Sequence, residues 1–265
     1  MDRRKVCIFG VSGRLGTAIT FAALEQGTGI TEVCGVDLVQ QMVNRRESVV
    51  EIARPENASK HLGTSDVVII AHSKPELVLE HAGMAVDQVV PLIIGTTGLN
   101  AATLEELARF AKTIPIVVAS NFSRGVVVVA KTVEDMARLL GPDCKVEIID
   151  EHHDGKKDVP SGTAKVFAEA ACRGLGLDPR KVIMVGRGPT KERAEPAERV
   201  MIHSVRGGTV FGEHEIRFLC PDEKTKIVHQ AESRGVFARG AVAAVNWVVQ
   251  QEPGLYDMRN VYGLE

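Results

Sequence analysis

Over roughly the first 120 residues, short apolar runs alternate with segments in which apolar residues recur every three or four positions. The apolar runs are too continuous for strands that bury one face, so they indicate parallel strands covered on both faces. The segments between them have the period of amphipathic helices. This pattern predicts a doubly wound, Rossmann-like α/β domain. The expected strands are residues 5–10, 30–37, 66–71, 90–97 and 114–120, and the expected helices are residues 13–27, 75–88 and 99–113.

After about residue 121 the pattern changes to longer helices and to strands in which apolar and polar residues alternate. Such alternation is typical of an antiparallel sheet with one solvated or subunit-facing side. Residues 47–63 interrupt the alternation of strands and helices in the first part of the chain and suggest a peripheral helix. The polar residues 186–199 suggest a mobile loop. Here the expected helices are residues 126–141, 161–176 and 235–250, and the expected strands are residues 144–153, 199–208, 209–221 and 224–233.

These two patterns predict two domains. The first is expected over residues 1–122, completed by residues 237–265, whose apolar helix should pack back onto it. The second, an α+β domain, is expected over residues 123–236.

Composition excludes several classes of function. The net charge of -2 gives no long-range field that would attract nucleic acid or an anionic membrane. No apolar run is long enough to span a bilayer, and the start MDRRKVCIFG lacks a signal-peptide pattern, so we expect a cytoplasmic protein. The five cysteines have no metal-type spacing, and the two in apolar strand-like runs are expected to be buried and reduced.

The strongest motif is glycine-rich and lies where the first strand meets the first helix. Gly10, Gly13 and Gly16 have the spacing G-x-x-G-x-x-G, which lets backbone N–H groups and the positive helix end approach a pyrophosphate. Asp37 follows Gly16 by 21 residues and ends the second strand, where its carboxylate would bind the adenosine ribose. Order and spacing together predict a dinucleotide site.

The cofactor preference depends on the residues around Asp37. Leu38 follows it and offers no cation for a 2′-phosphate, so we expect NADH to be used at least as well as NADPH. Arg14, Arg45 and Arg46 are the cations that could reverse this preference. Two later strands end in GTTG, residues 95–98, and ASNFS, residues 119–123, which either contact the cofactor or simply cap the next helices.

A second cluster of chemical groups lies in EHHDGKKDVPSGTA, residues 151–164. Ser161, Gly162 and Thr163 begin a helix, whose N–H groups either form a carboxylate cradle or are merely capped. His152 can exchange a proton near neutral pH, and a lysine with a lowered pKa could do the same. The other histidines are scattered and no third ligand is suitably spaced, so we expect no metal, and no G-x-S-x-G elbow supports a serine hydrolase.

These residues carry a resemblance to a known family. EIIDEHHDGKKDVPSGTA resembles the signature of 4-hydroxy-tetrahydrodipicolinate (dihydrodipicolinate) reductases of lysine and diaminopimelate biosynthesis. GVSGRLG, GTTG, SNFSRGV, VRGGTVFGEH and GLYDM are similar to this family in the same order. The resemblance implies a nucleotide domain, a mixed-sheet domain for substrate binding and oligomerisation, and a homotetramer. It also implies NADH or NADPH as cofactor and a small cyclic imine dicarboxylate as substrate.

By position, the resemblance implies a role for each matching residue. His152 and Lys156 would handle the proton. His153, Ser161, Gly162 and Thr163 would hold the substrate carboxylates. The cofactor would be lined by Gly10, Val11, Ser12, Gly13, Arg14, Leu15, Asp37, Gly95, Thr96, Thr97, Ala119, Ser120, Asn121 and Phe122.

Three positions depart from the family pattern. Residues 71–73 read Ala-His-Ser where Asp-Phe-Thr is usual, Val127 stands where asparagine is frequent, and Asp150 replaces a glutamate. The first departure keeps open a reductase of another small imino or keto dicarboxylate on the same fold. A non-catalytic NAD(H)-binding metabolite sensor is a third reading, although a pure binder has no need of a proton donor.

Overall fold

The computed structural model describes residues 3–38, 44–45, 48–49, 51–187 and 199–264, with the side chains of residues 39–50 left out. The chain divides into two compact units. Unit 1 comprises Met1–Arg124 with Arg234–Glu265, and unit 2 comprises Gly125–Ser233. The boundaries expected from the sequence, after residue 122 and before residue 237, stay predictions.

Unit 1 is built on a parallel sheet, as the apolar runs predict. Its strand order is β14-β8-β7-β6-β1-β2-β5. On one side of β1 lie β2 and β5, and on the other side lie β6, β7 and β8, in chain order. The direction of the connections therefore reverses beside β1, which makes this a topological switch point. The strands are β1 Arg4–Phe9, β2 Ile30–Val36, β5 Ile52–Ala53, β6 Val67–Ile70, β7 Leu92–Ile94, β8 Pro115–Val118 and β14 Gly254–Tyr256.

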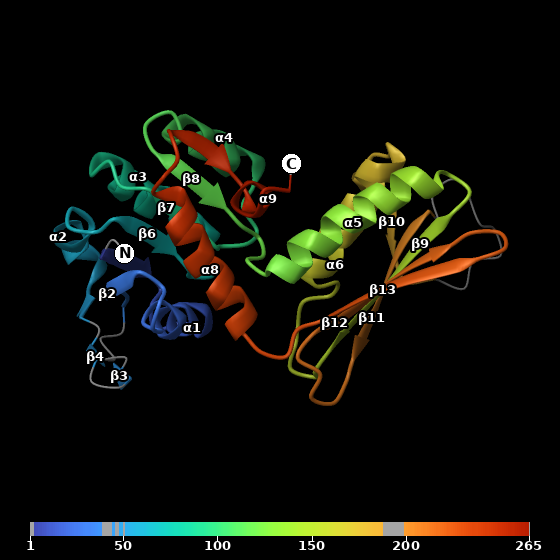
Figure 1. Ribbon diagram of the computed structural model, residues 1–265, viewed down its shortest axis with the longest axis horizontal. Helices are drawn as coiled ribbons and strands as arrows, with labels where there is room; N and C mark the ends of the chain where they lie inside the picture. The colour runs from blue at the N-terminus through green and yellow to red at the C-terminus, as the bar shows by residue number, and fades with distance from the viewer. Residues whose placement is uncertain (1–2, 39–43, 46–47, 50, 188–198, 265) are drawn as a thin grey trace. The chain divides into compact units, whose positions relative to one another are not determined.

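Helices cover both faces of this sheet (Figure 1). On one face, α1 (Arg14–Ala23) packs against α8 (Gly235–Val248), which also contacts β7 and β8. On the other, α3 (Val78–Asp87) and α4 (Ala101–Phe110) bury apolar side chains against alternate residues of β1, β2, β6 and β7. Burial on both sides explains why these strands read as continuous apolar runs.

One peripheral segment differs from the expectation. Instead of a helix over residues 47–63, the described part contains β5, a 3-10 turn at Pro55–Asn57 and the short helix α2, Ser59–Leu62. Two short strands, β3 Asn44–Arg45 and β4 Ser48–Val49, pair with each other. A helix through this segment is disfavoured because a proline inside it would lack the N–H that continues the hydrogen bonding.

Unit 2 contains a mixed sheet of order β10-β11-β9-β12-β13. β9, β12 and β13 are antiparallel, whereas β11 pairs with β9 and with β10 in parallel. The expectation that residues 199–208 belong to an antiparallel arrangement is therefore wrong, because the chain crosses over before β11. The strands are β9 Lys145–His152, β10 Ile183–Val185, β11 Val200–Arg206, β12 Glu213–Leu219 and β13 Lys224–Gln230.

Two helices predicted from the sequence cover one face of this sheet. α5 (Arg124–Leu140) and α6 (Gly162–Leu175) share a core with the inward residues of β9, β11 and β12. The short helix α7, Pro179–Val182, leads into β10, and α9, Met258–Tyr262, ends the chain in unit 1. None of the described helices is both long enough and apolar enough to cross a lipid bilayer. The mobile loop predicted over residues 186–199 lies mostly outside the described residues.

The cysteines are only partly as expected. Cys7 and Cys34, in the two apolar strands, are free and buried, and so is Cys172. Cys144 and Cys220, however, form a disulfide that the sequence did not predict. It joins the residue before β9 to the residue after β12, which are neighbouring antiparallel strands.

Candidate active site

The expected cofactor residues of unit 1 gather at the carboxyl edge of its sheet. The glycine-rich turn follows β1, Asp37 follows β2, Gly95 follows β7 and Ala119 follows β8. Contacts join these segments: the Thr96 hydroxyl donates to the carbonyl of His72 at 2.7 Å. Since β8, β7, β6, β1 and β2 are consecutive neighbours, the five strand ends form one continuous edge. Ligands of doubly wound sheets bind at this edge.

Two glycines of the turn have no room for a side chain. Gly10 has φ +81°, and a Cβ there would lie 2.9 Å from the backbone nitrogen of His72. A Cβ on Gly16 would lie 2.2 Å from the Gly10 carbonyl oxygen. Gly13 is the N-cap of α1. The turn is therefore closed tightly onto the helix N-terminus and offers the concave backbone that a pyrophosphate needs.

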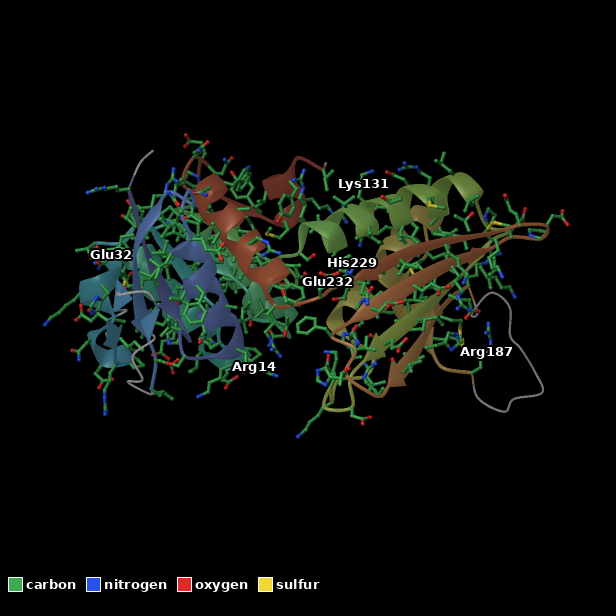
Figure 2. All side chains as sticks on the ribbon, turned by 60° about the horizontal axis from the view of Figure 1, so that its bottom comes forward. Arg14, Glu32, Lys131, Arg187, His229 and Glu232 are labelled. Atoms are coloured by element: carbon green, nitrogen blue, oxygen red, sulfur yellow. A yellow bond between two sulfur atoms is a disulfide. The ribbon has the colours of Figure 1, made fainter. Side chains whose placement is uncertain are left out.

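Asp37 is held at this turn by two backbone hydrogen bonds. Its Oδ2 accepts from the N–H of Ser12 at 3.0 Å, and its Oδ1 accepts from the N–H of Leu38 at 2.7 Å. Arg14, labelled in Figure 2, is the first residue of α1 and is exposed. The side chains of Arg45 and Arg46 lie outside the described residues.

His72, one of the departures from the family pattern, belongs to a histidine pair beside the glycine-rich turn. Its Nε2 lies 2.9 Å from Nδ1 of His81, whose ring stacks on Phe9 at a centroid distance of 4.2 Å. Burial and then the charge on His72 lower the pKa of His81 to about 4, and burial also lowers the pKa of His72. Nδ1 of His72 accepts from the N–H of Lys74, so the His72 proton is on Nε2 and points at His81. The pair is neutral at pH 7.

The ASNFS segment is fixed by the C-terminal part of unit 1. A Cβ on Gly240 of α8 would lie 1.9 Å from the carbonyl oxygen of Phe122, and a Cβ on Gly95 would lie 2.7 Å from its ring. The hydroxyl of Tyr262 donates to the same carbonyl at 3.1 Å. The guanidinium of Arg124 lies 5.7 Å from the centroid of the Tyr262 ring. The last helices therefore position Phe122 against the end of β7.

In unit 2, the expected catalytic residues lie at the end of β9 and in the loop after it. His152 is the last residue of β9 and is buried. His153 follows, and its N–H donates to the carbonyl of Val210 at 2.7 Å. Lys156 is partly exposed, and its Nζ lies 2.8 Å from both carboxylate oxygens of Asp158. Because a surface ion pair of this kind is weak, the ammonium group can exchange Asp158 for another carboxylate.

The expected substrate cradle begins α6. Ser161 is its N-cap, and the side-chain oxygen accepts from the N–H of Ala164 at 3.1 Å. Gly162 and Thr163 lie in the first turn, where the helix macrodipole is positive and favours a carboxylate. Ser161 can therefore cap α6 while the first turn of the helix holds a carboxylate, because the cap uses the N–H of Ala164.

Asp150 connects the end of β9 to this cradle. The carboxylate is completely buried and accepts from the N–H of Ser161 at 2.9 Å. Burial opposes its ionisation, but hydrogen bonds from His152, His214, Ser161 and Arg206 outweigh that effect and hold the pKa of Asp150 far below its usual range. Asp150 is therefore ionised at every physiological pH.

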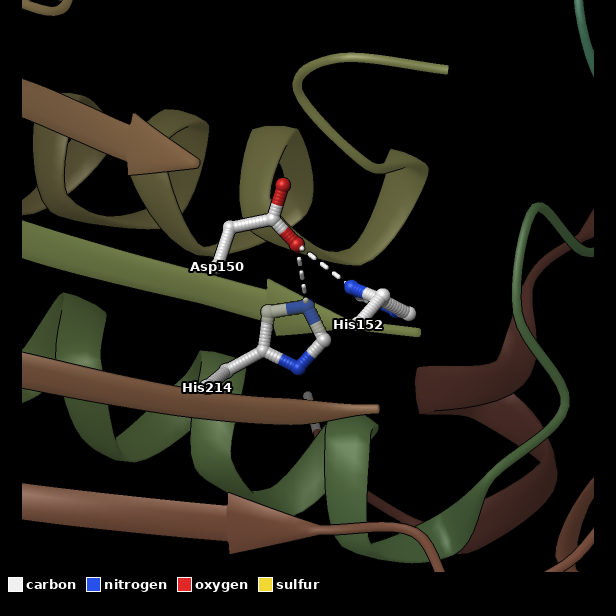
Figure 3. A group of neighbouring side chains, drawn as sticks. All are labelled: Asp150, His152 and His214. Carbon is white, nitrogen blue, oxygen red and sulfur yellow. Dashed lines mark ion pairs between the residues drawn. The ribbon is translucent and has the colours of Figure 1, made fainter. Parts of the chain in front are cut away.

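The structure corrects one expectation about the histidines. Asp150, His152 and His214 bring three ligand-type atoms within 4.8 Å of one another, so His214 is not scattered but completes a cluster (Figure 3). Arg206 already pairs with the same carboxylate at 2.9 Å, which weakens its attraction for a divalent cation. Ion-pair contacts of the carboxylate with both imidazoles and with Arg206 account for the cluster, and the absence of a metal stays a prediction.

Sequence reasoning missed the residues that surround Asp150. Ser204 and Arg206 of β11 and His214 of β12 all contact its carboxylate. The motifs VRGG and GEH, which include Arg206 and His214, carried the family resemblance but gave no sign of this role. The guanidinium of Arg206 also bonds the carbonyl of Asp158 at 2.8 Å, so it anchors the loop that contains Lys156.

The chain matches two family models along almost its whole length. Residues 4–122 match "Dihydrodipicolinate reductase, N-terminus", and residues 125–262 match "Dihydrodipicolinate reductase, C-terminus". The chain belongs to the dihydrodipicolinate reductase family. The resemblance read from the motifs is therefore confirmed.

Relatives within the dihydrodipicolinate reductase family match the chain from end to end. The 4-hydroxy-tetrahydrodipicolinate reductase of Pseudomonas fluorescens is 37% identical over 268 residues, covering 98% of this chain and 99% of the relative. That of Syntrophobacter fumaroxidans is 38% identical over 269 residues, with coverage of 98% and 99%. A dipicolinate-bound dihydrodipicolinate reductase from a Paenisporosarcina species has a similar structure, with a TM-score of 0.76, 25% identity and coverage of 97% and 98%.

Proposed function

We propose that this protein reduces 4-hydroxy-tetrahydrodipicolinate to tetrahydrodipicolinate with a nicotinamide cofactor, in lysine and diaminopimelate biosynthesis. The end-to-end match to reductases of this name carries the proposal. The loop of residues 151–164, with its histidines, lysine and helix N-terminus, is complete in this chain. In the reaction a hydride and a proton enter the substrate and one water leaves.

The cofactor is proposed to bind at the carboxyl edge of the sheet in unit 1. The turn from Gly10 to Leu15 would hold the pyrophosphate, because the missing Cβ atoms of Gly10 and Gly16 let the turn close tightly onto the N-terminus of α1. Asp37 would accept hydrogen bonds from the ribose. Gly95 to Thr97 and Ala119 to Phe122 would line the remaining part. When bound, the reduced nicotinamide supplies the hydride.

The substrate is proposed to bind at the loop of unit 2. One carboxylate would be held by the first turn of α6, at Ser161, Gly162 and Thr163, and His153 would contribute a further polar contact. The ammonium group of Lys156 would leave Asp158 for the substrate. His152 and Lys156 would then supply the proton to the carbon that becomes electron-rich after hydride addition.

A turnover assay tests the proposal directly. Freshly condensed pyruvate and aspartate semialdehyde supply the substrate, and the fall in NADH absorbance reports the reaction. Rapid oxidation that depends on the condensed product is expected. Oxidation only with another imino or keto dicarboxylate would favour the second candidate, which the unusual residues 71–73 beside the glycine-rich turn support. Cofactor binding without any oxidation would indicate a sensor.

NADH is expected to give a kcat/KM at least equal to that of NADPH. The carboxylate of Asp37 is fixed at the turn and would repel a 2′-phosphate. Asp37→Asn should shift the preference towards NADPH by roughly fivefold, since two unit charges about 4 Å apart interact by about 1 kcal/mol in water. Asp66→Asn is a matched control, because Asp66 accepts from Lys5 at the opposite edge of the sheet. A strong NADPH preference of the wild type would contradict the prediction.

Pyridine-2,6-dicarboxylate is expected to inhibit competitively with the substrate, because it presents two carboxylates on a planar ring. The Paenisporosarcina relative binds this compound. Pyridine-2-carboxylate is the control and should inhibit much more weakly, since it lacks the second carboxylate. Initial rates at several substrate concentrations distinguish the modes. Absence of competition at millimolar concentration would indicate a different ligand.

The protein is further proposed to be a cytoplasmic homotetramer assembled through the sheet of unit 2. α5 and α6 share a core with one face of this sheet. Val205 of β11 and Val228 of β13 point to the other face and are about half exposed. Light scattering should give a mass four times the 28.6 kDa of one chain.

A further inference from the structure

The carboxylate of Asp150 lies where three strands and one helix of unit 2 converge. Asp150 and His152 are two residues apart on β9, so their side chains point to the same side of the sheet. β11 contributes Ser204 and Arg206 on one side, and β12 contributes His214 on the other. The N-cap of α6 contributes Ser161.

The two oxygens of this carboxylate have different partners. Oδ2 accepts from the N–H of Ser161 at 2.9 Å, the hydroxyl of Ser204 at 3.0 Å and the guanidinium of Arg206 at 2.9 Å. These three donors fix the position of the carboxylate. Oδ1 faces the two imidazoles, with Nδ1 of His152 at 3.0 Å and Nε2 of His214 at 3.4 Å (Figure 3).

His214 is the neutral member of the cluster. Burial lowers its pKa although Asp150 opposes that effect, and the charges on His152 and Lys156 lower it further. Its Nδ1 is buried and has no hydrogen-bond partner among the described residues, so the proton is on Nε2. From there it faces the hydroxyl of Ser161 at 3.0 Å, and Oδ1 of Asp150 lies 3.4 Å from the same nitrogen.

His152 differs because a glycine borders the opposite edge of its ring. Its Nε2 lies beside Gly212, where an added Cβ would come within 2.9 Å of that nitrogen. The absence of a side chain at residue 212 therefore preserves the space at Nε2. An ionised carboxylate at Nδ1 requires a proton on that nitrogen, which leaves Nε2 as the position that exchanges a proton.

We propose that Asp150 is a positioning residue that holds His152 in the Nδ1–H tautomer, with Nε2 directed to the substrate, and ties this ring to the α6 cradle through Ser161. The inference rests on the proposed role of His152 in proton transfer. It assigns to one carboxylate the orientation of both the proton donor and the carboxylate cradle.

The substitution Asp150→Asn gives a sharp test. Three donors surround the position of Oδ2, so the amide must place its oxygen there and its NH2 group towards the two rings. A donor then faces Nδ1 of His152, and the proton must move to Nε2. We expect kcat to fall by about tenfold to a hundredfold, because a misoriented catalytic group loses the reactive geometry. The KM for NADH should stay unchanged.

The tautomer is read by NMR of 15N-labelled histidine, with His152→Gln identifying the resonances of His152. In the wild type the proton-bearing nitrogen of neutral His152 is expected to be Nδ1, and in Asp150→Asn it is expected to be Nε2. Asp150→Glu should restore the Nδ1–H tautomer and part of kcat. Ser204→Ala removes one of the three donors to Oδ2 but still leaves an acceptor facing His152, so the Nδ1–H tautomer should persist in this variant.

The outcomes separate this inference from the proposed function. A wild-type enzyme with the proton of neutral His152 on Nε2 overturns the inference, and this measurement does not depend on the folding of any Asp150 variant. A folded Asp150→Asn protein with wild-type kcat overturns it as well, while the proposed function stands. A wild-type protein that never oxidises NADH with the condensed substrate overturns the proposed function, whereas the tautomer is still measured.

Discussion

Lys156→Ala is expected to lower kcat by about two to four orders of magnitude, as the loss of a general acid does. The ammonium group is partly exposed and pairs with Asp158, so it is available to a substrate carboxylate or to the carbon that is protonated. Its ion pair with Asp158 is partly exposed and therefore weak, so the thermal stability should change little. Steady-state kinetics with saturating NADH measure the effect.

Lys157→Ala is the matched control for this substitution. It removes the same charge from the next residue of the same loop, where the side chain is exposed. Its kcat should remain within about a factor of two, because a surface charge contributes little. If Lys156→Ala raised only KM and left kcat intact, Lys156 would bind the substrate and the proton would come from His152 alone.

Gly16→Ala is expected to weaken NADH binding by roughly tenfold to a hundredfold, because the glycine-rich turn could no longer close on the helix N-terminus. The new Cβ would lie 2.2 Å from the Gly10 carbonyl oxygen, so the backbone of the turn at Gly10 or of the helix at Gly16 would have to move. Titration calorimetry with NADH measures the affinity, and the melting temperature reports how far the strain spreads.

Gly83→Ala provides the control in the same unit. Gly83 lies within α3, and an added Cβ there would meet nothing within 4 Å. This substitution should raise stability by about 0.5–1 kcal/mol, since alanine favours a helix over glycine, and leave NADH binding unchanged. Unchanged NADH affinity in Gly16→Ala would show that the pyrophosphate does not bind at this turn.

The amino-acid pattern alone was sufficient to predict the architecture of unit 1 and the edge of its sheet where a nucleotide would bind. Continuous apolar runs distinguish parallel strands that are buried on both faces from strands that have one face in water, because a strand buried on both faces has no position for a polar side chain. The glycine positions could be recognised in the same way. Glycine is required at residues 10 and 16 because a Cβ there would meet backbone within a few residues or at the end of the neighbouring strand. These are local constraints, and a linear pattern records them.

The sequence also identified the loop of residues 151–164. It located the helices α5 and α6, which cover the sheet of unit 2, and the helix α8, which completes unit 1. The prediction was wrong for β11, which was expected to be antiparallel but pairs in parallel; its first three residues, Val200, Met201 and Ile202, are all buried. Alternation reports that one face is buried and says nothing about the direction of the neighbour. It likewise gave no indication that Cys144 and Cys220 would meet, 76 residues apart.

The groups that surround His152 could be identified only in the folded protein. Asp150 lies two residues away along the chain, but Ser204, Arg206 and His214 are more than 50 residues distant and arrive through the register of β11 and β12. Register depends on how whole strands pack against α5 and α6, and not on any short motif. The sequence therefore supplied the proton-carrying side chains, whereas sheet pairing determined the hydrogen bonds that orient them.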